Sequence, residues 1–562
     1  MASLTKSKFL FFTTSPRTPF KMVSEIKLLG EKYSDKKWEL KTQKEFMRDL
    51  LKTDFFEGSG ASDLAFAARD RITRAPKSLG FVDLDPKIAI TDAGENLINS
   101  NIKEEVLLRQ LLKFQLPSPY HTQSKNIKFK FNVKPYLEIL RLVKYFGKLT
   151  FDEIMLFGLQ LIDYKKFDKI VKMIEKFRKE KSVTKESYSK FKSKYLKSII
   201  NKMYKEEIKS GDTKVRESNA KDLKTFYKTK ASNMRDYTDA CFRYLRATGM
   251  VNISQKLYSL SIAEDKEDEI DYILENVDRK PVFIDDKNKY KKYLFDGSLP
   301  RLYTDNKNNL INKIRAYDTS IAVSILKEKD IISLKEQLFL LKEEYKKQLI
   351  VDNIKQIKEY EKYDDIVNTY NEIKNKDLYD LPLMLEWNTW RAMNMLDGGV
   401  IVANLKFDDN GKPMSTAQGN VADICCDYGD FGLTVEVTMS KGARQYEMEG
   451  EPVARHLANY KKEIDRDAYC LFVAPEINEA CIAHFYALHN ININYYGGTS
   501  IILPIELSVF EKMLEDSYKA SYTPKPSNIK SLFEYSKSIS KSVKDESEWF
   551  SKIREKAINW LD

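Results

Sequence analysis

Residues 421–456 read VADICCDYGDFGLTVEVTMSKGARQYEMEGEPVARH. Two runs rich in β-branched and apolar residues, 421–426 and 433–437, flank the turn residues 427–430 and Gly432, a pattern typical of a β-hairpin. Asp423 lies in the first run and Glu436 in the second, where an ordinary strand would carry another apolar residue. A carboxylate in such a position is unfavourable unless it is paired, solvated or bound to a cation.

The two strands of a hairpin bring such positions face to face or diagonally across the pair. The carboxylates of Asp423 and Glu436 would then repel each other unless a hard divalent cation lay between them. Mg²⁺ is usually held by one or two carboxylates together with waters and substrate phosphate oxygens. Glu449 lies as far beyond Glu436 as Glu436 lies beyond Asp423, and could complete the acidic cluster from the next element.

Further along, residues 468–474 predict a buried strand that ends at Pro475, and residues 499–505 predict another. The expected order is helix, strand, strand, polar segment with a helix, strand. That order, with an acid on each of the first two strands, resembles the catalytic core of the PD-(D/E)xK nuclease superfamily. The wider region is similar to the AlwI-type family of type IIS restriction endonucleases, which includes strand-specific nicking enzymes. The residues that carry this resemblance are Glu386-Trp387, 418–424 (QGNVADI), 435–438 (VEVT) with 440–443 (SKGA), and 448–456 (MEGEPVARH).

The resemblance implies that Asp423 and Glu436 bind the metal, as one or two Mg²⁺ ions, and that Glu449 and Glu386 are further acidic members of the catalytic site. Thr438 occupies the place of the superfamily's usual lysine. Lys441 is a candidate for the group that steadies the attacking water. Hydrolysis in this superfamily leaves a 5′-phosphate and a 3′-hydroxyl.

Each acid also has an ordinary structural interpretation. Asp423 alone would fit a turn or a strand edge. Gly450 and Pro452 predict a helix boundary near Glu449, where a capping acid is common. Glu386 precedes two tryptophans in what the pattern predicts as an amphipathic helix, so a solvated acid is the alternative there.

The chain has 562 residues, which favours two to four domains. Its 94 Lys and Arg against 83 Asp and Glu give a net charge of +11, a bias toward a polyanionic partner. The five cysteines form no zinc-binding pattern, and their odd number in apolar runs indicates reduced thiols. The sequence contains no apolar run of signal-peptide or membrane-spanning length, so we expect a cytoplasmic protein without membrane partners. The resemblance to restriction endonucleases implies a prokaryotic source.

The first 280 residues predict two winged-helix-like units, at about 40–120 and 225–262. In the first, helices at 42–56 and 61–77 precede strands at 81–84 and 88–91 and a helix at 91–98. In the second, a helix at 234–248 precedes strands at 249–254 and 256–260. Helix, helix and hairpin is the order of a winged helix, in which one helix can enter the DNA major groove.

Residues 124–232 interleave lysines with aromatic residues, and lysines of this kind can neutralise DNA phosphates. Solvated helix faces and protein contacts are the alternatives for these features. The candidate DNA-binding residues are Arg17, Arg69, Arg71, Arg74, Arg235, Arg243 and Arg246.

We therefore expect a multidomain α+β protein. Residues 1–280 form the DNA-recognition region, residues 281–380 a helical linker, and residues 381–562 an α/β PD-(D/E)xK-like nuclease domain with a mixed central sheet.

The expected function is that of a type IIS restriction endonuclease, which reads a short asymmetric site in double-stranded DNA and cuts outside it. One carboxylate cluster cuts one strand at a time. We therefore expect a resting monomer that pairs transiently through the cleavage domain, acts sequentially, or uses a separate small catalytic subunit. A nicking endonuclease or the large subunit of a heterodimeric restriction enzyme is the alternative within the class. A non-catalytic winged-helix DNA-binding protein and a repair nuclease that recognises DNA shape are alternatives outside it. A cognate DNA methyltransferase is the expected system partner.

Overall fold

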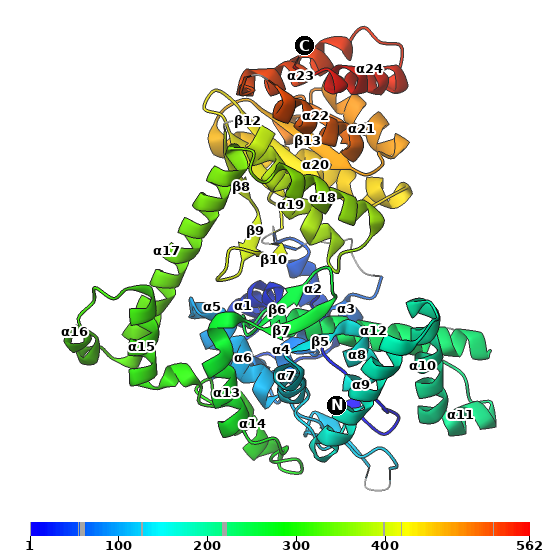
Figure 1. The fold of residues 1–562 in the computed structure, drawn as a ribbon, viewed down its shortest axis with the longest axis vertical. Coiled ribbons are helices and arrows are strands. Elements are labelled where there is room, and N and C mark those ends of the chain that lie inside the picture. The colour runs from blue at the N-terminus through cyan, green and yellow to red at the C-terminus, as the bar shows by residue number, and fades with distance from the viewer. Residues whose placement is uncertain are drawn as a thin grey trace. The chain divides into compact units, whose positions relative to one another are not determined.

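The computed structural model describes residues 2–53, 55–56, 62–124, 127–215, 222–396, 399–416, 419–520 and 522–561. The contacts divide the chain into two compact units, of which unit 1 ends at Leu341 and unit 2 continues from Lys342. Figure 1 labels the elements of both units. Among the described residues, none of the helices combines the length and apolar character needed to cross a membrane.

Unit 1 is mostly helical. Its helices are α1 (Met22–Tyr33), α2 (Leu40–Leu50), α3 (Leu64–Ile72), α4 (Ala75–Ser78), α5 (Asp92–Asn99), α6 (Lys103–Lys113), α7 (Pro135–Phe146), α8 (Phe151–Leu156), α9 (Phe167–Val183), α10 (Tyr188–Met203), α11 (Lys205–Ser210), α12 (Leu223–Arg246), α13 (Glu267–Asn276), α14 (Lys287–Phe295), α15 (Lys307–Tyr317) and α16 (Val323–Glu328). Its strands are β1 (Ala2–Ser3), β2 (Val82–Asp83), β3 (Ala89–Ile90), β4 (His121–Thr122), β5 (Lys148–Thr150), β6 (Val251–Ser254) and β7 (Ser259–Ile262).

The first predicted recognition unit has the expected order, with corrected boundaries. The helix predicted at 42–56 is α2, which ends at Leu50, and strands β2 and β3 pair antiparallel. The helix predicted at 61–77 is interrupted, and its first residue lies outside the described residues. Pro76 explains the interruption between α3 and α4, because proline has no N–H to donate to the carbonyl four residues back.

The second predicted recognition unit contains a strand that the local pattern did not reveal. Strands β6 and β7 form the expected hairpin after α12, and β5 pairs antiparallel with β7 to give a three-stranded sheet in the order β5-β7-β6. Pro135 begins α7, and Thr150 caps α8 through a reciprocal hydrogen-bonded box with Glu153. The chain order is therefore α7, β5, α8, then α12, β6 and β7, with α9 to α11 between α8 and α12.

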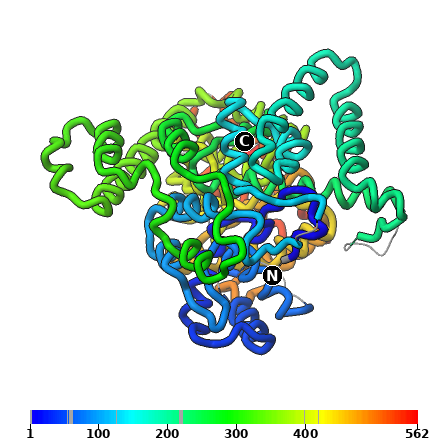
Figure 2. The backbone as a smooth tube through the Cα atoms, turned by 90° about the horizontal axis from the view of Figure 1, so that it is seen from below, coloured from blue at the N-terminus to red at the C-terminus, as the bar shows by residue number. Residues whose placement is uncertain are grey.

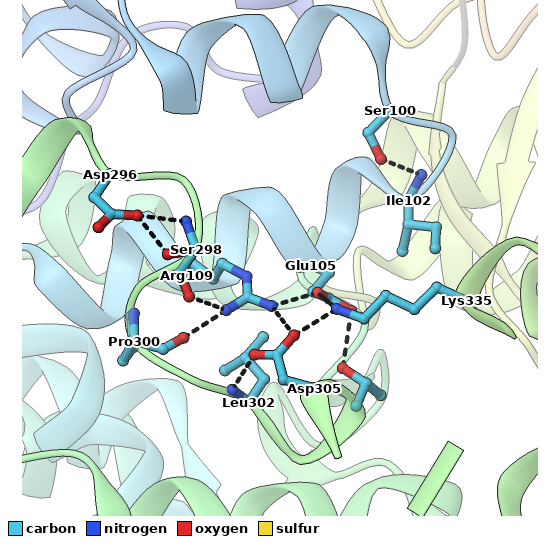
Figure 3. Close-up of polar contacts among 11 residues, drawn as sticks. Ser100, Ile102, Glu105, Arg109, Asp296, Ser298, Pro300, Leu302, Asp305 and Lys335 are labelled. Atoms are coloured by element: carbon cyan, nitrogen blue, oxygen red, sulfur yellow. Dashed lines mark hydrogen bonds and ion pairs between the residues drawn. The ribbon is translucent and has the colours of Figure 1, made fainter. Parts of the chain in front are cut away.

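An ionic cluster joins α6, the segment before α15 and the first turns of α17 (Ile331–Lys358) within unit 1 (Figure 3). Arg109 lies 2.6 Å from Glu105 and 2.7 Å from Asp305, and Lys335 lies 2.5 and 2.7 Å from the same two acids. Burial alone would raise the pKa of Asp305, but the hydrogen bond and charge of Arg109 lower it to about 2. The start of α17 is thus held by two shared carboxylates.

Unit 2 is an α/β unit built on a mixed sheet. Its helices besides the rest of α17 are α18 (Tyr363–Asn375), α19 (Leu381–Leu396), α20 (Ala443–Ile464), α21 (Glu479–Asn490), α22 (Leu507–Lys519), α23 (Pro526–Ile539) and α24 (Glu546–Ile558). Its strands are β8 (Val400–Ala403), β9 (Leu405–Phe407), β10 (Pro413–Thr416), β11 (Ile424–Asp427), β12 (Gly432–Val437), β13 (Ala468–Ala474) and β14 (Ile502–Glu506). The predicted mixed central sheet is confirmed.

The five strands of this sheet lie in the order β14-β13-β12-β11-β8. Strands β8, β11 and β12 are antiparallel neighbours, and β12, β13 and β14 are parallel. Strand β12 is buried along its whole length, as expected for a central strand that is covered on both faces. Strand β8, which the sequence did not predict, pairs with β11 at the sheet's edge.

Helix α20 approaches β12 closely because β12 begins with a glycine. A Cβ atom on Gly432 would lie 2.4 Å from Ile464 and 2.7 Å from Tyr460, both on α20. The Tyr460 hydroxyl also donates to the Cys426 carbonyl at 3.1 Å. Because side chains alternate along a strand, the face that α20 covers at Gly432 is also the face of Glu436.

Candidate active site

The hairpin of β11 and β12 brings the two predicted metal ligands opposite each other. Its antiparallel register pairs Ile424 with Val435, and one step further along the same register places Asp423 opposite Glu436. Directly opposite residues of an antiparallel pair point to the same face of the sheet. The backbone N–H of Val437 donates to Asp423 Oδ2 at 2.9 Å, and the backbone N–H of Asn404 donates to the Asp423 carbonyl at 2.8 Å.

Helix α20 adds two more polar side chains beside this pair. Glu449 and His456 lie seven residues, about two helical turns, apart and therefore on one side of α20. His456 Nδ1 lies 2.7 Å from Glu436 Oε1, with both side chains largely buried. Glu449 was expected near a helix boundary, but α20 continues through Pro452, so Glu449 is an interior helical residue.

Burial raises the pKa of every acid in the cluster, and the charge of a neighbouring acid adds to the shift for Asp423, Glu436 and Glu386. For Asp423, burial is the larger cause and the charge of Glu436 the next, and its pKa is well above the ordinary value. Burial and the charge of Glu449 act in the same direction on Glu436. Burial also raises the pKa of Glu449, although a hydrogen bond from Thr438 opposes the shift.

Glu386 reaches the same cluster from α19. Burial raises its pKa well above the ordinary value, and the charge of Asp423 is the next largest cause. The pKa of His456 is lowered, first by burial and then by the charge of Arg455, which favours the neutral imidazole. The contact between His456 Nδ1 and Glu436 Oε1 is a hydrogen bond in which the tautomer of the imidazole decides which side chain donates.

The donor set of this cluster fits a hard divalent cation. Carboxylate oxygens are the ligands that Mg²⁺ prefers, and one or two of them suffice because waters complete its coordination. Among the residues that the structure describes, no three His, Cys, Asp or Glu side chains converge closely enough to hold a metal ion by themselves. The side chains of Asp423 and Glu436, whose charges raise each other's cost of ionisation, are the pair that a cation would neutralise.

A model of one protein family, described as AlwI restriction endonuclease, matches residues 77–513, a span that includes all four acids. The chain belongs to the AlwI restriction endonuclease family. It is thus a member of a family of nucleases that hydrolyse DNA.

Among the solved structures to which the chain is similar are two restriction endonucleases. The small subunit (R.BspD6I2) of the heterodimeric restriction endonuclease R.BspD6I is 26% identical, over 35% of this chain and 95% of that one, with a TM-score of 0.28. Restriction endonuclease FokI is 11% identical, over 93% of this chain and 98% of that one, with a TM-score of 0.23. These TM-scores are too low to support an argument about fold. No curated protein matches the chain.

Within this AlwI-family chain, Thr438, which was predicted to take the place of the usual lysine of PD-(D/E)xK nucleases, is buried. Its hydroxyl accepts a hydrogen bond from the Ser440 N–H at 3.0 Å. Lys441, the candidate replacement, places its ammonium 2.7 Å from Glu476, and both of these side chains are exposed. The role predicted for Lys441 stays a prediction.

Two residues beside the acids, Arg455 and His456, were not assigned to the site from the sequence. The Arg455 guanidinium donates to the side chain of Asn420, three residues before Asp423, and to Glu451 at 3.0 Å. The motif that contains Glu449 ends in Arg455 and His456, so the sequence gives their spacing from Glu449. It does not give their hydrogen-bond partners, which lie on other elements.

The candidate DNA-binding arginines on α3, and Arg74 just after it, have intramolecular partners. Arg71 pairs with Glu25, which is buried, and Arg69 donates to Gln43 at 2.9 Å. Arg74 lies 2.5 Å from Asp70. Arg71 therefore compensates a buried charge, whether or not it also contacts DNA.

The other candidate arginines belong to α12 or lie near it. Arg243 lies 2.8 Å from Asp239 and also donates to the backbone carbonyl of Arg17, so the two predicted residues are joined. Arg17 and Arg235 are exposed, whereas Arg246 is partly buried. The assignment of these residues to DNA stays a prediction.

Proposed function

We propose that the chain is a type IIS restriction endonuclease. It recognises a short asymmetric sequence in double-stranded DNA and hydrolyses phosphodiester bonds at a fixed distance outside it, leaving a 5′-phosphate and a 3′-hydroxyl. The observation that carries the proposal is the pair of partly buried carboxylates, Asp423 and Glu436, opposite each other on neighbouring strands with two more acids beside them. Such a set is unfavourable in a metal-free fold and is explained by a cation-dependent reaction.

Asp423 and Glu436 would hold Mg²⁺. The bound ion would lower the pKa of a water molecule and offset charge on the phosphoryl group in the transition state. The Val437 N–H fixes one oxygen of Asp423, and His456 fixes one oxygen of Glu436, so both carboxylates are oriented by hydrogen bonds. Glu449 and Glu386 are suited to orient the attacking water or a second ion.

Sequence recognition is assigned to unit 1. The order α7, β5, α8, α12, β6 and β7, with β7 central in its sheet, matches the helix, strand, helix, helix and hairpin of a winged helix. In such a unit α12 is the helix that enters the major groove, and its exposed residues include Arg235. The elements α2 to α5 with β2 and β3 would supply a second reading surface.

The test is digestion of supercoiled and linear plasmid by the purified chain, with Mg²⁺ or with EDTA, beside Asp423→Ala and Glu436→Ala. Discrete Mg²⁺-dependent fragments that both substitutions abolish are the expected result. Sequence-specific binding with no cutting under any divalent ion would reject the proposal in favour of a non-catalytic DNA-binding protein. Cutting at junctions or ends regardless of sequence would favour a repair nuclease.

A strand-specific nicking endonuclease, or the large subunit of a heterodimeric enzyme, is a second candidate function. It is favoured by one observation: the described residues contain one hairpin with paired acids, and one such site cuts one strand at a time. Open circles without linear product would select this candidate. Linear product would require a transient homodimer, sequential cutting by one chain, or a separate small subunit.

A further inference from the structure

The positive charge of the chain is concentrated in one segment. Residues 165–210 contain sixteen Lys and Arg against six Asp and Glu, a net charge of +10, while the whole chain has a net charge of +11. The other residues together carry 78 basic and 77 acidic side chains. The polyanion bias of the chain therefore belongs to this segment, which contains α9, α10 and α11.

This segment interrupts the unit that we assign to recognition. Helix α8 ends at Leu156 and α12 begins at Leu223, so 66 residues separate two helices that a helix-turn-helix joins by three or four. The three-stranded sheet forms around this interruption, because β5 precedes α8 and β6 and β7 follow α12. The helices α9 to α11 are therefore an insertion that the sheet does not require.

Helices α9 and α10 lie side by side as a hairpin, as the backbone in Figure 2 shows, and aromatic rings pack between them. The Phe177 ring on α9 lies 5.3 Å from Phe191 and 5.0 Å from Tyr195 on α10, and 5.3 Å from Phe157 beside α8. The Tyr195 hydroxyl also bonds to Glu180. The inner face of the hairpin is thus filled with aromatic side chains. Most of its lysines are exposed, and Lys192 pairs with Asp152 on α8.

The exposed lysines follow the helical repeat. On α9, Lys169, Lys172, Lys176 and Lys179 recur every three or four residues and are all exposed, a row about 15 Å long. On α10 there are five lysines and no acidic residue, and Lys190, Lys194 and Lys197 form a second exposed row. Lys176 pairs with Glu180 on α9, and Lys194 pairs with Glu186 just before α10, so acids compensate part of each row. Helix α10 itself departs from the mixed charge pattern of an ordinary solvated helix.

Helices of unit 2 provide the comparison. On α22, Lys512 lies 2.7 Å from Asp516, and on α24, Lys552 lies 2.9 Å from Glu548. Like charges at this spacing destabilise a helix. A row of lysines without interspersed acids on α10 is explained by a polyanion that neutralises it.

We propose that the α9–α10 hairpin holds the DNA duplex through its phosphates, independently of sequence. This inference rests on the proposed function for its partner, double-stranded DNA. The two lysine rows match the linear array of a duplex backbone, which carries one charge per about 1.7 Å of axis. The hairpin adds affinity for any duplex, and α12 adds discrimination between sequences.

The test measures binding of a fluorescent duplex of mixed sequence, about 40 base pairs long, in EDTA at about 50 to 200 mM KCl. One variant replaces Lys169, Lys172 and Lys179 by Gln, and a second replaces Lys190, Lys197 and Lys202. The slope of log affinity against log salt should fall in magnitude by about 0.9 for each phosphate that the variant no longer neutralises, thus by about 2–3 in each variant. Slopes equal to that of the parent chain would overturn the proposal.

Two controls separate a local effect from total charge. Gln at the exposed Lys347, Lys355 and Lys541 removes the same charge elsewhere and should leave the slope within error. Arg in place of the three α9 lysines keeps the charge and should keep the slope. An equal fall in slope for the Lys347, Lys355 and Lys541 control would also overturn the proposal, because net charge would then explain the effect.

A second measurement needs no variant. Acetylation of the unmodified chain, followed by mass spectrometry, should show the α9 and α10 lysines protected by the duplex and Lys347 and Lys541 unprotected. If the chain cuts plasmid but the duplex does not protect the hairpin lysines, only this inference is rejected. If the chain never cuts, the proposed function is rejected, while the salt slopes and the protection in EDTA still test whether the hairpin binds DNA.

Discussion

At the scale of single residues, the site is a set of acids that the metal-free fold tolerates at a cost. Burial raises the pKa of Asp423, Glu436, Glu449 and Glu386, and for all of these except Glu449 a neighbouring acid is the next cause. A carboxyl whose pKa is raised by folding destabilises the folded state at neutral pH. Removing one charge should therefore stabilise the protein while it removes activity.

We predict this outcome for Asp423→Asn, which keeps the side chain's shape. One unit of pKa shift corresponds to about 1.4 kcal/mol, and about 1 kcal/mol shifts the melting temperature of a unit of this size by about 2–4 °C. In EDTA at neutral pH the variant should thus melt a few degrees higher, by calorimetry. Cleavage should fall by about a thousandfold or more, since ligand loss costs several kcal/mol of transition-state stabilisation.

Asp427→Asn on the same strand is the matched control. Arg466 lies 2.9 Å from Asp427, and the hydrogen bond from Arg466 lowers the pKa of this acid. Loss of this carboxylate should not raise the melting temperature. An equal rise in both variants would contradict the argument.

The same prediction fixes a pH dependence. Because the raised pKa values belong to the folded state, its carboxyls gain protons before those of the unfolded chain as pH falls. The stability of the parent chain in EDTA should rise as the pH falls from neutrality through the raised pKa values of the folded state, and the advantage of Asp423→Asn should shrink over the same range. A difference in melting temperature that stays constant with pH would reject electrostatic strain as its cause.

Only some of the residues in this site could be predicted from the sequence. Asp423 and Glu436 stood out because each interrupts an apolar strand pattern, which is a local signal. His456 and Arg455 were not assigned because their partners, Glu436 and Asn420, lie 20 and 35 residues away. Spacing along α20 could show which side of the helix they share with Glu449, but it could not show what that side contacts.

At the scale of elements, local patterns predicted the hairpin of β11 and β12 and the buried strand β13. The bounds of β13 were predicted correctly. They did not predict β5, because Lys148 pairs with Ser261, more than a hundred residues away. They also indicated a helix boundary at Pro452. The interior proline costs α20 one backbone hydrogen bond, which its packing on β12 and β13 offsets.

The packing of α20 on β12 gives a prediction at this scale. Gly432→Ala would place a methyl group 2.4 Å from Ile464 and 2.7 Å from Tyr460, so the helix must move or the side chains must repack. Such overpacking costs about 1–3 kcal/mol. We expect a matching decrease in unfolding free energy in urea, and slower cleavage because α20 also carries Glu449 and His456.

The second change Ile464→Val separates this clash from a backbone effect. It removes the Cδ1 atom that the new methyl group would meet, so Gly432→Ala with Ile464→Val should regain part of the stability of the parent chain. Additive losses in the double variant would show that the alanine acts through the strand itself.

At the scale of the whole molecule, the excess positive charge and the candidate catalytic acids lie in different units. The net positive charge lies in residues 165–210 of unit 1, and the paired acids lie in unit 2. Composition predicted a polyanionic partner, but only the positions of α8 and α12 showed that the basic segment is an insertion. The predicted helical linker at 281–380 is divided between the units, because α17 carries residues of both.

One acidic hairpin in the described chain has a consequence for double-strand cutting. If linear product requires two active chains paired through their cleavage domains, mixing the parent chain with an equal amount of Asp423→Asn at constant total protein leaves about a quarter of the pairs fully active. Formation of linear plasmid from nicked circles should then fall to about one quarter, while nicking falls to about one half. The two products are resolved on a gel over time.

A fall of linear product to one half, in step with nicking, would instead indicate that a single chain cuts both strands in sequence. Absence of linear product from the parent chain at every concentration would identify a nicking enzyme that needs another subunit to break both strands.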